Sequence, residues 1–377
     1  MKKFLFIIPI LIFCFSFSIG AFETHDLNEI YSEQLKAVGG DELSENLPEE
    51  SKKTLDNIGV KKADLFDISK LDFKKVLDEV VKIGKRKSVS PFLSLMPALA
   101  VILVVSILKF LEVSSRNTSM STVIDCIGTI CLCVTLVSPI VNFIYVVSVV
   151  IQSAAKFTLA VVPVISGVMM ASGHTMSATS YHMLVVTAGQ IVSYVSVNWL
   201  VPILNTLLGV SLISSISSRI NLSGFCDEVE KIIKSFLKTI SSLFVGVLTL
   251  QNLVSNSADS LGANTLKLTI DSCVPIVGGA ISDAFLTVRG CLNVLKVGIG
   301  AFGIIAGGVI FLPVILECFC WMFYLSVCKL AADMLEVKKI SCFLKSTKNI
   351  ISLLLAVLLL AIVVLIVSIA VVLIIGR

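Results

Sequence analysis

Charged residues are scarce in this sequence, since Asp, Glu, Lys and Arg make up only 15% of its 377 residues. Soluble domains average about 25% charged residues, whereas this chain is 56% apolar and has a mean hydropathy of +0.98. These values exclude a single soluble domain, and the small net charge of +4 argues against a nucleic-acid partner. The composition predicts an all-α polytopic membrane protein.

The short motifs of the common catalytic and metal sites are also missing. No G-x-x-x-x-G-K-[ST], H-E-x-x-H, C-x-x-C or G-x-S-x-G pattern occurs. The 11 cysteines are scattered through apolar stretches, where a free cysteine packs as a small hydrophobic residue. His174 and His182 are more simply explained as packed or solvated side chains than as catalytic ones. We therefore expect no catalytic, cofactor-binding or metal site.

Nearly half of the charge lies in one polar segment, residues 22–90. It holds 15 Asp and Glu and 12 Lys and Arg. Two lysines, an apolar run over residues 4–17 and small residues precede it, which is typical of a signal peptide. We expect a signal peptide at residues 1–21, with an uncleaved anchor helix as the alternative, and a small extracytoplasmic helical domain at 22–90. The basic residues 85–87 would favour the cytoplasm, but a segment of this length can be translocated despite them.

Turn and cap residues divide the polar segment into three or four short helices. Pro48 suits the start of a helix, the acidic Glu49 and Glu50 suit its first turn, and Gly59 interrupts the pattern. A core built from about 70 residues is thin. The segment is therefore either a solvated spacer or a module that docks on a partner or on the membrane surface.

The rest of the chain is built for lipid, and much of it repeats. After two spans at residues 91–150, similar segments recur at an offset of 107 to 112 residues. We predict a duplication, with repeat 1 at residues 156–256 and repeat 2 at 267–376. Chance resemblance between apolar stretches is the alternative. The prolines that define the repeat form two pairs: Pro163 with Pro275, and Pro202 with Pro313.

Each copy shows about four segments. A Pro-containing apolar segment is followed by an apolar stretch long enough for two crossings, a lysine-rich connector and a final apolar span. Four crossings preserve the direction of the chain, so the two copies are expected to be parallel. With the first two spans, this arrangement predicts ten crossings. The Pro-containing segments could instead be re-entrant hairpins or broken helices.

Two kinds of polar residue stand out as candidate sites. Ionisable residues lie within the apolar stretches of the second copy, where each should face protein or water: Asp283, Arg289, Lys296 and Glu317. A buried pair that fixes helix packing explains them more simply than a polar path or a substrate contact, and both interpretations remain open.

The glycines Gly303 and Gly307 form a G-x-x-x-G pattern, which predicts close packing of two helices.

The connectors at residues 219–239 and 329–348 supply the second kind. They share a Glu-Val-x-Lys-Ile element, and their lysines favour a cytoplasmic position. Their apolar and basic residues alternate at helical spacing, so that they could lie in the membrane interface or dock a partner protein. The candidate docking residues are Lys231, Lys234, Lys238, Lys338, Lys339 and Lys345.

The order of these features resembles the stage III sporulation protein AE family of endospore-forming bacteria. The resemblance rests on Leu47–Glu49, Ile58–Gly59, the opening of the first span at Pro97–Val101, and the duplicated Val162–Gly167 and Val274–Gly279. It implies a multi-pass protein in the mother-cell membrane around the forespore. It also implies a non-enzymatic role in a channel or secretion complex between the two cells that supports forespore development.

The resemblance further implies partners. They are the lipid bilayer, other stage III sporulation proteins including a cytoplasmic ATPase, and a protein on the forespore side. The missing nucleotide-binding motif fits a separate ATPase. Two other functions remain in view. A secondary transporter would carry solute between the two repeats, although the charges are unequal between them, and a membrane enzyme would need a catalytic constellation that the sequence does not display.

Overall fold

The computed structural model describes residues 35–36, 39–60, 68, 71–113, 118–216, 223–273 and 278–374, and all of the regular elements in these ranges are helices. The signal peptide predicted at residues 1–21 lies outside the described residues. The helices in chain order are η1 (Gly40–Ser44), α3 (Glu49–Ile58), α5 (Phe73–Val113), α6 (Thr118–Ala171), α7 (Thr175–Val195), η2 (Ser196–Leu200), α8 (Val201–Ile216), α9 (Ser223–Cys273), α10 (Gly278–Met334) and α11 (Lys338–Ile374).

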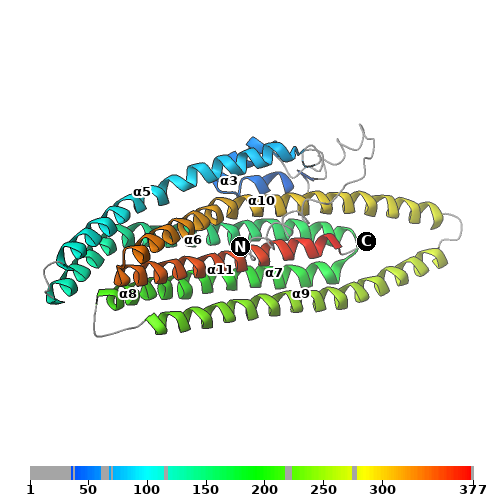
Figure 1. The fold of residues 1–377 in the computed structure, drawn as a ribbon. Coiled ribbons are helices and arrows are strands. Elements are labelled where there is room, and N and C mark those ends of the chain that lie inside the picture. The colour runs from blue at the N-terminus through cyan, green and yellow to red at the C-terminus, as the bar shows by residue number, and fades with distance from the viewer. Residues whose placement is uncertain are drawn as a thin grey trace.

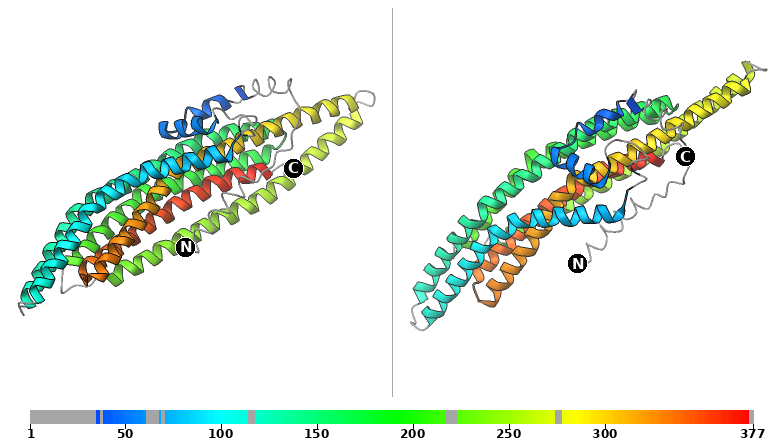
Figure 2. Two further views of the ribbon diagram at one scale, coloured as in Figure 1. Left: turned by 45° about the horizontal axis from the view of Figure 1, so that its top comes forward. Right: turned by 90° about the horizontal axis from the view of Figure 1, so that it is seen from above.

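The long helices lie side by side in an elongated bundle, and each runs opposite to the one before it (Figures 1 and 2). In Figure 1, α5 runs toward the left-hand end, α6 returns, and α7, η2 and α8 together form the next rod. As a result, α5 ends at the same end of the bundle at which α9 and α11 begin. We call this the lysine-rich end, because the two connectors lie there. We call the other the Asp259 end, because Asp259, in the second half of α9, lies beside the start of α7 there.

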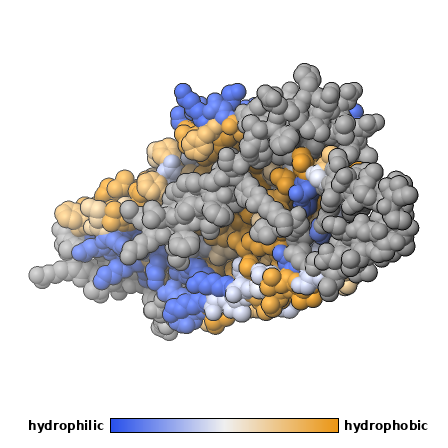
Figure 3. All heavy atoms as spheres, turned by 90° about the vertical axis from the view of Figure 1, so that its right-hand side faces the viewer, coloured by the Kyte–Doolittle hydropathy of each residue, from blue (hydrophilic) through white to orange (hydrophobic). Residues whose placement is uncertain are grey.

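Six helices of the described residues are long and apolar enough to cross a membrane, each with 36 to 49 residues. At 1.5 Å per residue they are roughly 54 to 74 Å long, well beyond the ~30 Å of a bilayer core. Each can therefore hold a span together with an extension into water. Seen from the Asp259 end, the described residues form alternating hydrophobic and hydrophilic patches (Figure 3).

The number of segments per copy differs from the sequence-based expectation. The long apolar stretches were expected to cross twice, yet each forms one rod, made of α7, η2 and α8 in the first copy and of α10 in the second. The connector at residues 219–239 continues into its final span as α9, whereas the connector expected at 329–348 is divided: its first residues end α10 at Met334, and the rest, from Lys338, continues into the final span as α11. The connectors run on into the final spans because the sequence between connector and span contains no proline and no turn sequence that would end a helix, either in α9 or in α11. Parallel directions for α7–α8 and α10, and for α9 and α11 (Figure 1), are what a parallel duplication would give, but the duplication itself stays a prediction.

Prolines do not end these helices. Pro163 and Pro313 lie inside α6 and α10, and Pro202 is the second residue of α8, while Pro275 lies outside the described residues. A proline removes one amide donor and crowds the preceding turn. Immediately before Pro202 the chain forms a π turn, η2, which accommodates that disturbance without breaking the rod.

The centre of the bundle is formed by α10 and α11. Of their most apolar 18-residue stretches, 61% and 67% of the residues are buried, compared with 17% in α9 and 28% in α5. The predicted close packing at Gly303 and Gly307 is confirmed: a Cβ atom built on these residues would lie 2.9 Å from Ile369 and 2.3 Å from Leu365 of α11. The absence of side chains at these positions of α10 lets the two helices approach each other.

The polar segment folds onto the bundle. The predicted start of a helix after Pro48 is confirmed, and α3 ends at Gly59, whose φ of 92° is the left-handed conformation that favours glycine. The helix packs against both α5 and α10. The carboxylate of Glu50 forms ion pairs with Arg86 and Lys87 of α5. The same helix, α5, continues through the expected domain boundary at residue 90 into the first span.

Candidate functional site

The two connectors contact each other at the lysine-rich end. The carboxylate of Asp227 in α9 accepts hydrogen bonds from Lys345 Nζ at 2.9 Å and from Asn349 Nδ2 at 3.1 Å, both in α11. In return, Lys234 of α9 donates to Ser352 Oγ of α11 at 3.0 Å and forms an ion pair with Glu230. Two of the predicted docking lysines, Lys234 and Lys345, are therefore engaged in contacts between α9 and α11.

The apolar faces of the connectors differ in burial. In α11, Ile340, Phe343 and Leu344 are completely buried in the bundle. In α9, Ile233 and Leu237 are buried, but their neighbours Ile232 and Phe236 are 66% and 53% exposed. The α11 connector is thus a part of the core, whereas the α9 connector presents an outer face.

The remaining docking lysines lie at the same end of the bundle, in α9 and at the start of α11. Lys231 forms an ion pair with Glu228 at 2.5 Å on the surface, and both Lys238 and Lys338 are exposed. Lys339 is half-buried, with its Nζ 3.6 Å from the Sγ of Cys126. The end of the bundle therefore carries exposed basic groups beside apolar side chains, an arrangement suited to acidic headgroups or an acidic protein surface.

The ionisable residues predicted inside the second copy can be placed only in part. Lys296 is buried in α10, and Glu317 is half-buried in the same helix. The side chains of Asp283 and Arg289 lie outside the described residues, so that their pairing stays a prediction. Within the described part of the chain, no group of three or more His, Cys, Asp or Glu residues is arranged to hold a metal ion.

A polar cluster that the sequence analysis missed lies at the Asp259 end. The two carboxylate oxygens of Asp259, in α9, accept hydrogen bonds from the backbone amides of Met176 and Ser177, each at 3.0 Å. His174 Nδ1 lies 3.8 Å from the same carboxylate. The first turn of a helix has amide groups without partners and a partial positive charge, so this buried carboxylate caps α7 and joins it to α9.

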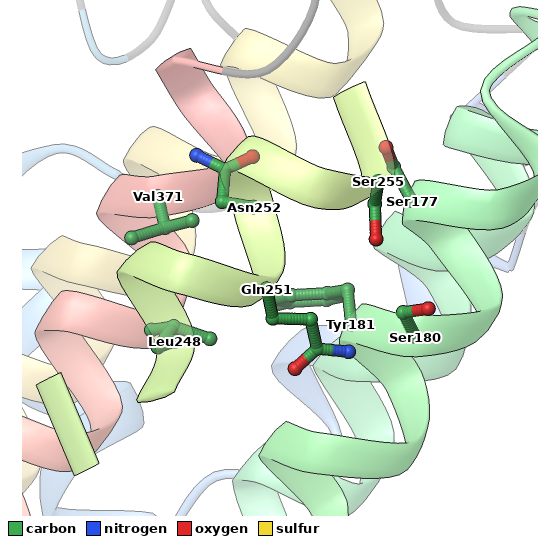
Figure 4. A pocket seen from close by; sticks show the side chains of 8 residues that line it. All are labelled: Ser177, Ser180, Tyr181, Leu248, Gln251, Asn252, Ser255 and Val371. Atoms are coloured by element: carbon green, nitrogen blue, oxygen red, sulfur yellow. The ribbon is translucent and has the colours of Figure 1, made fainter. Parts of the chain in front are cut away.

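The cluster continues into the bundle along both helices. Ser255 and Gln251 precede Asp259 in α9 at intervals of four residues, and Tyr181 follows Ser177 in α7 at the same interval. Except for Asp259 itself, these residues line a small cavity between α7, α9 and α11 (Figure 4). The spacing of Gln251, Ser255 and Asp259 was the available signal, since residues four apart share one face of a helix, but the sequence does not reveal which helix that face contacts.

Comparisons with known proteins point to one family. The family model described as stage III sporulation protein AE matches residues 61–376. The chain is 23% identical over 158 residues to the Stage III sporulation protein AE of Bacillus subtilis (strain 168), an alignment that covers 41% of this chain. It spans only 39% of that relative's length. No solved structure matches significantly. Because the family model covers most of the chain, the protein belongs to the stage III sporulation protein AE family.

Proposed function

We propose that this protein is a non-enzymatic integral membrane component of a channel or secretion complex that joins the mother cell and the forespore and supports forespore development. The observation that carries the proposal is the family match over residues 61–376. Six helices able to cross a membrane fit a subunit that lies permanently in the bilayer. The proposed location of the protein is the mother-cell membrane that surrounds the forespore.

The proposed topology puts the lysine-rich end in the cytoplasm of the mother cell. Basic residues favour the cytoplasmic side of a membrane, and both connectors begin at this end of the bundle (Figure 1). Since α5 runs toward this end, its first turns and the polar segment attached to them would then lie on the other side. The ion pairs of Glu50 with Arg86 and Lys87 attach α3 to the first turns of α5, so the two would lie on the same side of the membrane.

The proposed docking surface for a cytoplasmic partner is the outer face of the α9 connector, defined by Ile232, Phe236 and Lys238, together with Lys338 at the start of α11, at the same end of the bundle. A cytoplasmic ATPase and the other stage III sporulation proteins are the partners proposed for this surface. The structure refines the choice of residues, because Lys234 and Lys345 hold the connectors together and their replacement would disturb folding.

Complementation of a deletion strain tests this function. The double variant Lys238→Glu and Lys338→Glu should insert normally into the membrane, but it should lower the yield of heat-resistant spores and the amount of co-purified ATPase. Lys109→Glu is unsuitable as a control, because that lysine pairs with Asp125 at 2.7 Å. The exposed Lys53, in α3, provides a charge reversal outside the docking surface. Normal spore yield in the absence of the entire chain would refute the sporulation role, whereas normal ATPase recovery with the double variant would refute only the docking surface.

A further inference from the structure

Two cavities of similar size lie within the described bundle, and their linings differ in polarity. One is the cavity between α7, α9 and α11, with Tyr181, Gln251 and Ser255 in its wall (Figure 4). The other lies between α6, α7 and α11, with Phe157, Val185 and further aliphatic side chains in its wall. Each has room for about one water molecule.

The first cavity contains buried polar atoms without partners. The hydroxyl of Tyr181, a residue only 3% exposed, has no hydrogen-bond partner, and neither does Oε1 of Gln251. Leaving such a group unsatisfied in a protein interior costs about 1 to 3 kcal/mol. Native proteins usually avoid this cost with an ordered water molecule where the cavity is polar and large enough.

The second cavity offers water no such partners. Its hydroxyl groups already donate to backbone carbonyls within their own helices, Thr158 to Ala154 at 2.9 Å and Ser368 to Val364 at 2.5 Å. The rest of the wall is aliphatic or aromatic. Small apolar cavities stay empty in proteins.

We propose that the cavity between α7, α9 and α11 is a binding site for one ordered water molecule, which bridges Tyr181 and Gln251, while the cavity beside Phe157 is dry. Water suits this site because it accepts a hydrogen bond from the tyrosine hydroxyl and donates one to the glutamine oxygen. The hydroxyls of Ser180 and Ser255, in the same wall, supply further partners.

The water site lies where α9 is attached to α7. This helix has the least buried apolar stretch of the six, and at the Asp259 end it contacts α7 through a carboxylate, an amide and hydroxyls. Such groups can exchange partners with water, whereas a dry apolar interface loses its contacts when it opens. With this water in place, the contact of α7 with α9 at the Asp259 end is polar and hydrated.

Radiolytic footprinting of the full chain in lipid nanodiscs tests the proposal. X-rays generate hydroxyl radicals from bound water inside the protein, so a bulk radical scavenger does not suppress the labelling of a side chain beside such a water. Tyr181 should be labelled several-fold more than Phe157 in the presence of the scavenger. Equal and low labelling of the two residues, or labelling of Tyr181 that the scavenger abolishes, would overturn the proposal.

A substitution provides an independent measurement. Gln251→Leu removes one of the two groups that hold the water and leaves a side chain of similar overall size, so the labelling of Tyr181 should fall several-fold. Gln190→Leu makes the same change at an exposed position of α7 and should leave it unchanged. Unchanged labelling of Tyr181 in a folded Gln251→Leu variant would contradict the bridging role. If that variant does not fold, the comparison of Tyr181 with Phe157 in the unaltered chain still decides the question.

Discussion

Replacing Gly307 by alanine tests the close contact between α10 and α11. The added Cβ would lie 2.3 Å from Cδ2 of Leu365, whereas carbon atoms in favourable contact are about 3.5 to 4.0 Å apart. Leu365 must adopt another rotamer, or the two helices must move apart. Overpacking of this kind costs about 1 to 3 kcal/mol of unfolding free energy.

The neighbouring Gly308 supplies a matched control, since a Cβ atom there would meet nothing within 4 Å. Both substitutions gain the same intrinsic helix preference of alanine, about 1 kcal/mol, so that the difference between them isolates the steric effect. We expect Gly307→Ala to be about 1 to 3 kcal/mol less stable than Gly308→Ala. Titration with SDS of the protein in mixed micelles, followed by tryptophan fluorescence, measures both free energies.

A second substitution removes the clashing side chain. Leu365→Ala alone should cost about 2 to 5 kcal/mol, because it leaves a cavity in the core. Combined with Gly307→Ala, the total should be smaller than the sum of the two single effects, since the added methyl group then occupies vacated space. Equal stabilities of Gly307→Ala and Gly308→Ala, together with additive effects in the double variant, would show that this contact does not hold the helices together.

Three further predictions concern polar contacts. Asp259→Ala should lower the unfolding free energy by about 1 to 3 kcal/mol, because the amides of Met176 and Ser177 lose their acceptor; the loss should be smaller for Asp259→Asn, and an equal loss in SDS titration would contradict the capping role. Asp227→Lys or Lys345→Asp alone should lower the unfolding free energy by up to about 1 kcal/mol, and the double variant, in which the two charges are exchanged, should lower it by less. Additive effects of the two substitutions would show that the pair does not stabilise the fold. Glu50→Lys should repel Arg86, release α3 and raise the rate of proteolysis near residue 60, whereas Glu50→Gln should have a weaker effect; equal rates would argue against an electrostatic contact.

The helices and their polar ends could be predicted from the sequence because these depend on local patterns. The start of α3 after Pro48, its end at Gly59 and the close packing at Gly303 each follow from a property of one or a few neighbouring residues. A glycine in an apolar helix indicates close approach whichever helix approaches it.

The contacts between distant segments could not be predicted in this way. The two connectors share a sequence pattern, yet Phe343 is buried and Phe236 exposed, because one connector lies in the centre of the bundle and the other at its edge. The partner of Asp259 is a helix end more than 80 residues away in the sequence. Nothing in the local sequence identifies that partner, since any helix start offers the same amide groups.

The π turn before Pro202 has a consequence for the faces of the rod that contains it. A π turn holds one residue more than an α-helical turn, and one residue corresponds to a rotation of about 100° around the helix axis. The extra residue within Ser196–Leu200 therefore sets the angle between the side of α7 that bears Tyr181 and the side of α8 that bears Leu204, both of which are buried. Deleting a single residue from this turn would leave a continuous α-helix but would rotate one of these two faces out of the bundle. The two halves of the rod are thus matched in angle as well as in length, and the segment between them tolerates a substitution far better than a change in its number of residues.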